Sequence, residues 1–259
     1  MRGRILLKFG GSVITDKQSY ESANLNVIKN IAKAVGENWE RLRGNITIIN
    51  GAGSFGHAVV DKYKVGNVKI ETELHKLGFS ETFRACNELS NIVSKYLISN
   101  GVPSVFIPPL FFVVQDHRKV VEFNKDIILD FMNEGYLPLS GGNMVNDISL
   151  GKSIISGDTI IEYLSSEFGV VAFGTDVDGV YDYKGDVIPV INRDNLSEIS
   201  KFLHTRKGDY TGAMMGKINR IFNMDSKRVF IFNLNNLDQL RELLRYGEIK
   251  SGRFTVIFT

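Results

Sequence analysis

The 259-residue sequence predicts an α/β protein, a three-layer αβα sandwich with a largely parallel central sheet. Short runs rich in Val, Ile, Leu and Phe recur along the chain, and they are apolar throughout rather than at alternate positions. Continuous apolarity is typical of strands that are buried on both faces. Longer amphipathic segments separate most of these runs, so we expect helices to cover both faces of the sheet.

Seven apolar runs are expected to form the strands of the sheet. In chain order they span residues 4–9, 45–50, 103–107, 136–140, 170–173, 228–232 and 254–258. Residues 79–97 are predicted to form a helix whose single cysteine, Cys86, packs into the core. Residues 111–123 and 144–155 are each predicted to form a β-hairpin between the strand-helix units, where such hairpins commonly overhang a site.

Length and charge favour one enzyme-sized domain. We expect a single domain over residues 1–259, with approximate lobes 1–168 and 169–259. A net charge of +2 gives no field that would favour nucleic acid or a membrane surface as a partner. No run approaches the roughly 18 apolar residues of a membrane span, and the N-terminus enters a glycine loop before a cleavable signal could form, so a cytoplasmic protein is expected.

A glycine loop, "GAGSFGH" at residues 51–57, follows the second predicted strand. Its first six residues match the G-x-G-x-x-G pattern of dinucleotide sites. That pattern needs an acidic residue at the end of a strand about 20 residues further on. Glu71 and Glu73 lie at that distance, but the segment before them is short and broken by glycine. An NAD-dependent oxidoreductase would therefore require a strand ending near Glu71.

A second loop of the same kind, "KFGGSVITDK" at residues 8–17, follows the first predicted strand. Such loops expose backbone N–H groups and lead into a helix N-terminus, which favours an anion. Lys8 and Lys17 flank the first loop, whereas His57 ends the other. Two loops imply two anions, as a phosphate donor and a phosphate-bearing acceptor would provide. The Walker A spacing and the protein-kinase motifs are absent.

Three further segments carry polar residues next to predicted elements. Asp158, in "SGD", lies where a helix N-cap is expected, and a simple cap is the alternative to a functional role. Asp176, Asp178 and Gly179 follow a strand and can be turn formers or the rim of a nucleotide site. "TGAMMGK" at residues 211–217 is expected to be a loop that opens a helix, with Lys217 one turn in.

No metal centre is predicted from the remaining histidines. His75, His117 and His204 have no ligand spacing with any Cys, His or acidic partner, so they are expected to be surface or packing residues.

Together these segments resemble the amino acid kinase superfamily and, within it, the isopentenyl phosphate kinases. The resemblance spans the chain and includes "KFGGSVITDK", "GAGSFGH", "ISGDTI", "TDVDGVY" and "TGAMMGK" in the family's order. The run ending in S-F-G-H is the most specific part, because that histidine marks the branch that phosphorylates a phosphate or phosphonate. The resemblance implies a homodimeric enzyme that uses ATP and Mg²⁺ to convert isopentenyl phosphate to isopentenyl diphosphate.

The resemblance also assigns roles to individual residues. Lys8, Lys17 and Lys217 would contact the phosphates of ATP, with Lys17 stabilising the phosphoryl group in transfer, and Asp158 would orient these lysines. The acceptor phosphate would be surrounded by Ala52, Gly56, His57 and Gly157. The nucleotide would be held by the same lysines and by Gly10, Gly11, Ser12, Gly53, Thr175, Asp176, Gly179, Gly212 and Ala213.

Departures from the family pattern leave alternatives open. They fall at Ala52, Asn143, Ala213 and Leu234. The acceptor could be another small phosphate or a phosphonate such as fosfomycin, and a non-catalytic nucleotide or oxyanion binder on the same fold is a third reading. An apolar acceptor tail would lie along the first hairpin and a helix from about residue 74 to 97, with Phe79, Phe83 and Phe111 as candidate walls.

Overall fold

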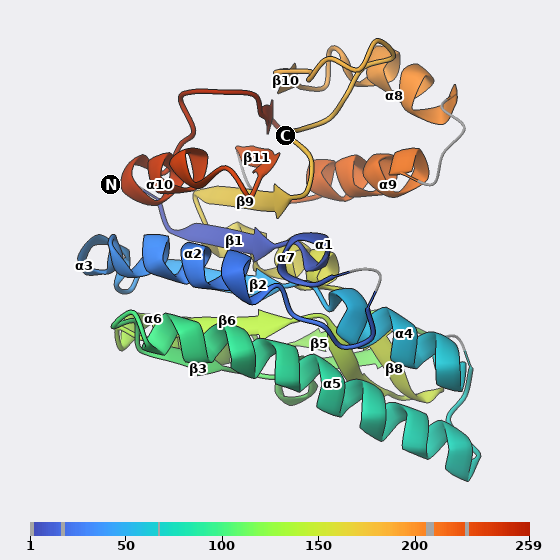
Figure 1. Ribbon diagram of the computed structural model, residues 1–259. Helices are drawn as coiled ribbons and strands as arrows, with labels where there is room; N and C mark the ends of the chain where they lie inside the picture. Colours follow the sequence, from blue (N-terminus) through green and yellow to red (C-terminus); the bar gives the residue numbers. More distant parts are fainter. Residues whose placement is uncertain (1–2, 17–18, 67, 206–209, 226–227) are drawn as a thin grey trace.

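The structure is a computed structural model that describes residues 3–16, 19–66, 68–205, 210–225 and 228–259 (Figure 1). The strands are β1 Ile5–Phe9, β2 Ile46–Asn50, β3 Ser104–Phe106, β4 Val113–Asp116, β5 Lys119–Phe123, β6 Leu137–Gly141, β7 Asn143–Asp147, β8 Gly151–Ile155, β9 Val170–Thr175, β10 Val190–Ile191, β11 Val229–Asn233 and β12 Thr255–Ile257. The helices are α1 Gly11–Ile14, α2 Leu25–Gly36, α3 Trp39–Leu42, α4 Gly53–Tyr63, α5 Glu73–Ile98, α6 Asp126–Asn133, α7 Gly157–Leu164, α8 Leu196–Thr205, α9 Tyr210–Phe222 and α10 Leu237–Tyr246, with 3₁₀ turns η1 Pro109–Phe111 and η2 Ser165–Glu167.

The described residues form a central sheet in the order β10-β12-β11-β9-β1-β2-β6-β3. All neighbouring strands run parallel except β11 and β12, which are antiparallel. The prediction of a largely parallel sheet is therefore confirmed, and each of the seven predicted apolar runs overlaps one of its strands, whereas the two-residue strand β10 was not predicted. Because β1 lies between β2 and β9, the loops that follow these three strands meet at one edge of the sheet.

A smaller sheet, β5-β4-β7-β8, contains both predicted hairpins. The hairpins join through the parallel pair β4 and β7. At the tip of the first hairpin, His117 and Arg118 have φ angles of 46° and 66°. The buried carboxylate of Asp147 accepts hydrogen bonds from both backbone N–H groups, at 3.2 and 2.8 Å. The second hairpin thus fixes the left-handed turn of the first.

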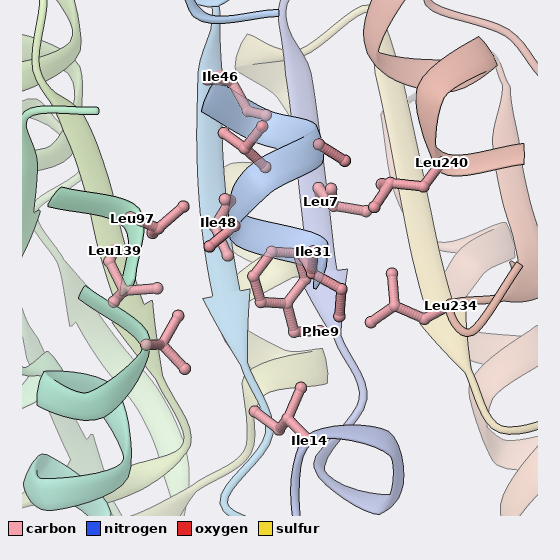
Figure 2. Close-up of a cluster of buried hydrophobic side chains, with 14 of the residues drawn as sticks. Leu7, Phe9, Ile14, Ile31, Ile46, Ile48, Leu97, Leu139, Leu234 and Leu240 are labelled. Carbon is pink, nitrogen blue, oxygen red and sulfur yellow. The ribbon is translucent and has the colours of Figure 1, made fainter. Parts of the chain in front are cut away.

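Two apolar cores, one on each face of the central sheet, confirm the three-layer arrangement. On one face, β1 and β2 point Leu7, Phe9 and Ile48 at α2, α5 and α10 (Figure 2). Figure 1 shows α2 in front of β1 and β2, and α5 in front of β3 and β6. On the opposite face, Ile49 and Phe173 pack with residues of α6, α7 and α9. This alternation along each strand explains why the runs are apolar throughout: both faces are covered.

Three helix boundaries differ from the sequence expectations. The N-cap of α7 is Ser156, whose hydroxyl accepts from the N–H of Thr159, so Asp158 lies inside the helix and is not a cap. Helix α9 already begins at Tyr210, which places Lys217 two turns in rather than one. Helix α4 begins at Gly53, within the predicted loop of residues 51–57, so His57 is the fifth residue of that helix rather than the end of a loop.

Within the described part of the chain, no helix combines the length and apolarity needed to cross a membrane.

Candidate active site

The two glycine loops lie backbone against backbone at the carboxyl ends of β1 and β2. Gly10 N–H donates to the carbonyl of Gly174 at 2.8 Å, and Gly51 N–H donates to the carbonyl of Phe9 at 2.8 Å. A Cβ atom on Gly11 would lie 2.5 Å from the backbone nitrogen of Gly53. Real Cβ atoms do not approach backbone this closely, so glycine is required for the loops to meet.

Buried hydroxyl groups hold the two loops together. Thr15 Oγ1 donates to the carbonyl of Gly11 at 2.7 Å and accepts from Ser54 N–H at 3.1 Å. Ser54 Oγ in turn accepts from Ser22 N–H at 3.3 Å. Thr15 and Ser54 were not predicted as site residues, although each lies within one of the quoted loop motifs. Their roles depend on a contact between loops that are about 40 residues apart in the chain.

A cluster of charges lies at the end of β1. Lys8 forms an ion pair and hydrogen bond with Asp158, and the two side chains are only 13% and 23% exposed. The ammonium group of Lys217 lies 5.1 Å from the centre of the Phe173 ring, and that of Lys8 lies 5.9 Å from the same centre. Phe173 is the register neighbour of Lys8 on β9 and was not predicted as a site residue. The structure therefore brings Lys8, Asp158 and Lys217 together.

The pKa values of this cluster show how its charges depend on one another. Burial opposes ionisation of Asp158, but the charges of Lys8 and Lys217 overcome it, so the pKa of Asp158 lies below its usual value. Burial lowers the pKa of Lys217, and nearby Asp158 opposes that shift. Folding thus holds two cations around one carboxylate in a partly desolvated place, which suits them to receive the negative charges of phosphate groups.

Gly157 lies beside the charge cluster. A Cβ atom there would lie 3.7 Å from Cε of Lys8 and 3.4 Å from the carbonyl oxygen of Asn50, the last residue of β2. The first turn of α7 is therefore close to both glycine-loop strands. This position agrees with the expectation that Gly157 belongs to the same site as Lys8.

The second glycine loop presents His57 on the outside of α4. The side chain of His57 is exposed, and no hydrogen bond or ion pair joins its ring to another described residue. Ala52, the N-cap of α4, directs its methyl group at Gly56, where a Cβ atom would be only 2.6 Å away. The family departure at Ala52 is thus accommodated by the glycine at position 56.

The first glycine loop borders a pocket of about 760 Å³ that reaches Asp176. The described lining residues are Ser12, Thr15, Asp16, Ser22, Ala23, Asn24, Leu25, Asn26, Lys29 and Asp176. Thr175 turns its hydroxyl inward to the carbonyl of Val177 at 2.8 Å, and Gly179 packs against Thr255 of β12. Of the predicted nucleotide residues, Ser12 and Asp176 therefore share this pocket, whereas the side chain of Thr175 points into the protein.

Three predicted residues lie wholly or partly outside the described part of the structure. Lys17 lies outside the described residues. Gly212 and Ala213 belong to α9, but the side chains of that helix are described only from Met214 on.

Two of the residues that depart from the family pattern, Asn143 and Leu234, are buried near the ends of strands. Asn143 is buried and donates to Oδ1 of Asn87 on α5 at 2.7 Å. Leu234 is also buried, and a Cβ atom on Gly174 would lie 2.8 Å from it. Asn143 therefore ties β7 to α5, and Leu234 packs against the end of β9.

The aromatic residues proposed as acceptor walls are not core residues. Phe79 and Phe83 are partly exposed on α5, with ring centres 6.0 Å apart, and Phe111 is 68% exposed. Cys86 on the same helix is buried, as predicted, and burial raises the pKa of its thiol to about 12. A thiolate nucleophile is therefore not available at this position.

The requirement for a dinucleotide site is not met. Residues 68–72 contain no strand, and Glu73 is the first residue of α5. The acidic residues at the expected distance thus lack the strand end that would present them to a ribose.

The chain belongs to the amino acid kinase family, whose match spans residues 3–233. It is 32% identical to isopentenyl phosphate kinase of Methanothermobacter thermautotrophicus, over 97% of this chain and 98% of the relative. Identity to isopentenyl phosphate kinase of Methanocaldococcus jannaschii is 31%, over 95% and 96% of the two chains. A crystal structure of isopentenyl phosphate kinase is similar with a TM-score of 0.80 at 28% identity, and the match covers 97% of this chain and 99% of that one.

Proposed function

We propose that this protein transfers the γ-phosphoryl group of ATP to isopentenyl phosphate, giving isopentenyl diphosphate and ADP. Membership of the amino acid kinase family supports this, as does similarity to isopentenyl phosphate kinases along nearly the whole chain. The arrangement of the site carries the proposal: two glycine loops in backbone contact, beside a cluster of Lys8, Asp158 and Lys217. Such an arrangement suits two phosphate-bearing molecules that must be brought together.

The chemistry needs positioning more than proton transfer. A phosphate monoester already carries about −1.5 to −2 charge at pH 7, so one of its oxygens can attack the γ-phosphorus without a general base. The new P–O bond forms in line with the bond between the γ-phosphorus and the bridging oxygen of the β-phosphate. That second bond breaks, and its electron pair stays on the oxygen, which leaves as part of ADP. The barrier is the approach of two polyanions, and fixed cations and backbone N–H groups lower it.

The proposal assigns the two substrates to the two loops. Lys8 and Lys217 contact the ATP phosphates and Asp158 orients them, in agreement with their shared cluster. Lys17 stabilises the phosphoryl group in transfer, an assignment that rests on the family resemblance alone. His57 donates a hydrogen bond to the acceptor phosphate. Of the two approximate lobes, residues 1–168 supply the acceptor side together with Lys8 and Asp158 at the ATP phosphates, and residues 169–259 add Lys217 and Asp176 on the nucleotide side.

Mg²⁺ is part of the proposal as the ion that accompanies ATP. It usually binds through one or two carboxylates together with the phosphates of a nucleotide. Asp16 and Asp176 line the same pocket as Ser12 and are the carboxylates that would hold it. No group of three or more Cys, His or acidic residues within the described ranges forms a metal cage. The ion would neutralise phosphate charge as the nucleotide binds.

A homodimer in the cytoplasm completes the proposal and rests on the family resemblance. Analytical ultracentrifugation of the purified chain measures the oligomeric state, and a monomer at assay concentrations would remove this part alone.

The proposal is tested by ADP release from ATP and Mg²⁺ with four acceptors: isopentenyl phosphate, dimethylallyl phosphate, geranyl phosphate and fosfomycin. We expect selective turnover of the short prenyl phosphates. Turnover of fosfomycin alone would identify a phosphonate kinase. ATP binding without turnover of any acceptor would contradict the proposal and favour a binding protein on the same fold.

A further inference from the structure

Helix α9 carries a second cation toward α7, one turn after Lys217. Arg220 Nη1 donates to Thr159 Oγ1 at 2.8 Å and lies 3.6 Å from Glu162 Oε2. Lys217 and Arg220 are three residues apart and therefore share a helix face. On α7, Thr159 and Glu162 contact Arg220. Asp158 lies near both cations, and the charges of Lys217 and Arg220 both help to lower its pKa. The two helices meet along a polar seam formed by these five side chains.

The seam reaches the N-cap of α7. Thr159 Oγ1, which accepts from Arg220, lies 2.9 Å from Ser156 Oγ, and Ser156 caps the helix by accepting from Thr159 N–H at 3.1 Å. Arg220 is thereby connected to the turn that contains Gly157 and Asp158. The Arg220 side chain, 46% exposed, thus links α9 to that turn.

The proposed reaction requires an anchor for α9 other than Lys217. In that reaction Lys217 contacts ATP phosphates, so its attraction to Asp158 is shared with a substrate that enters and leaves. Ile218 and Ile221 pack the underside of α9 into the core, but these contacts include no directional bond to α7. A hydrogen-bonded guanidinium fixes direction as well as distance.

We propose that Arg220 is a positioning residue that holds α9 against α7 and so keeps the ammonium group of Lys217 beside Asp158. This inference rests on the proposed phosphoryl transfer. Arg220 acts through Lys217 and touches neither substrate.

The test compares the steady-state kinetics of Arg220→Met, Arg220→Lys and wild-type enzyme with ATP and isopentenyl phosphate. Methionine keeps the length of the side chain and removes its charge and donors. We expect kcat to fall between about 10- and 100-fold in Arg220→Met, because small misplacements of a catalytic group cost this much. The KM for isopentenyl phosphate should stay within about twofold of the wild-type value, because Arg220 does not lie at the acceptor loop. A change in both kcat and this KM would instead indicate that the whole site had collapsed. Arg220→Lys should restore part of kcat.

Arg193→Met is the matched control. The Arg193 guanidinium lies 5.9 Å from the ring of Phe222, so it also contacts α9, but away from the seam. This variant should keep the kcat of the wild type. An equal loss in Arg193→Met and Arg220→Met would show that any loosening of α9 has the same effect, and it would overturn the positioning role.

A double substitution tests whether Arg220 acts through Lys217. In a Lys217→Ala background, Arg220→Met should cause no further loss of kcat, because nothing remains to be positioned. A full additional loss would contradict the inference. The turnover of the wild type separates the two proposals. If the wild type phosphorylates no acceptor, the proposed function fails. If the wild type is active and Arg220→Met has the same kcat, only the positioning role is overturned.

If the wild type is inactive, ATP binding by calorimetry still decides the matter. Arg220→Met should then weaken ATP binding as Lys217→Ala does, and unchanged affinity would overturn the inference.

Discussion

The two glycine loops follow neighbouring parallel strands, yet the charges around them differ. At the first loop, Lys8, Asp158 and Lys217 are gathered by folding and compensate one another away from solvent. At the second, His57 is exposed and has no described polar partner. The charges at the first loop are paired within the protein itself, whereas under the proposed function His57 would gain its partner only from the acceptor phosphate. Substitutions should therefore affect both stability and activity at the first loop, and activity alone at His57.

Asp158→Asn should produce the largest effect. It keeps the shape of the side chain but leaves Lys8 and Lys217 without their carboxylate, so the two cations repel each other at the end of β1. We expect kcat to fall by about 10³-fold, the upper end of losses from removing one electrostatic group. Melting temperature should fall as well. Assays of ADP release and calorimetric unfolding measure both, and an unchanged melting temperature would mean that the cluster is not a stabilising one.

His57→Ala should lose activity without losing stability. Removing a single donor to the acceptor phosphate is expected to lower kcat/KM for isopentenyl phosphate by about 10²-fold. The exposed ring contributes no described hydrogen bond, so the melting temperature should stay within about 1 °C, as surface substitutions usually do. A large drop in melting temperature would erase the distinction between the two loops.

Gly53→Ala tests the backbone contact that joins the loops. Gly53 has a φ angle of +51°, and a Cβ atom would lie 2.1 Å from Thr15 Oγ1. Both the left-handed backbone and the clash oppose alanine, so unfolding free energy should fall by about 1–3 kcal/mol. Gly216→Ala is a control, because nothing lies within 4 Å of its Cβ position. Equal urea midpoints for the two variants would contradict the contact.

Acid should reduce the stability that the cluster of Lys8, Asp158 and Lys217 contributes. The folded-state pKa of Asp158 lies below its usual value, so its stabilising contribution is present above the ordinary carboxyl pKa near 4 and disappears as pH falls through the folded pKa. Urea midpoints of wild type and Asp158→Asn should therefore differ most near neutral pH and begin to converge as pH falls below about 4. A difference that does not change with pH would show that Asp158 acts through packing rather than charge.

The fold could be predicted because its signals are local sequence patterns, whereas the roles of the site residues follow from the family resemblance and stay predictions. Uninterrupted apolar runs indicated strands covered on both faces, and glycine loops after two of them indicated anion sites. Phe173, Thr15 and Ser54 could not be found in this way, because their roles depend on which strands and loops become neighbours. Asp158 shows a different case: its helix was expected, but the cap is Ser156, two residues earlier, and Asp158 is instead a charge partner of Lys8.

The assignment of one substrate to each loop is tested most directly by equilibrium binding. Isothermal titration calorimetry of wild type and His57→Ala would measure the affinity for isopentenyl phosphate and, separately, for ATP. We expect the substitution to weaken isopentenyl phosphate binding at least about tenfold, or 1.4 kcal/mol, with the ATP affinity unchanged. Weakened ATP binding with unchanged isopentenyl phosphate binding would contradict the assignment and place the nucleotide at the second loop.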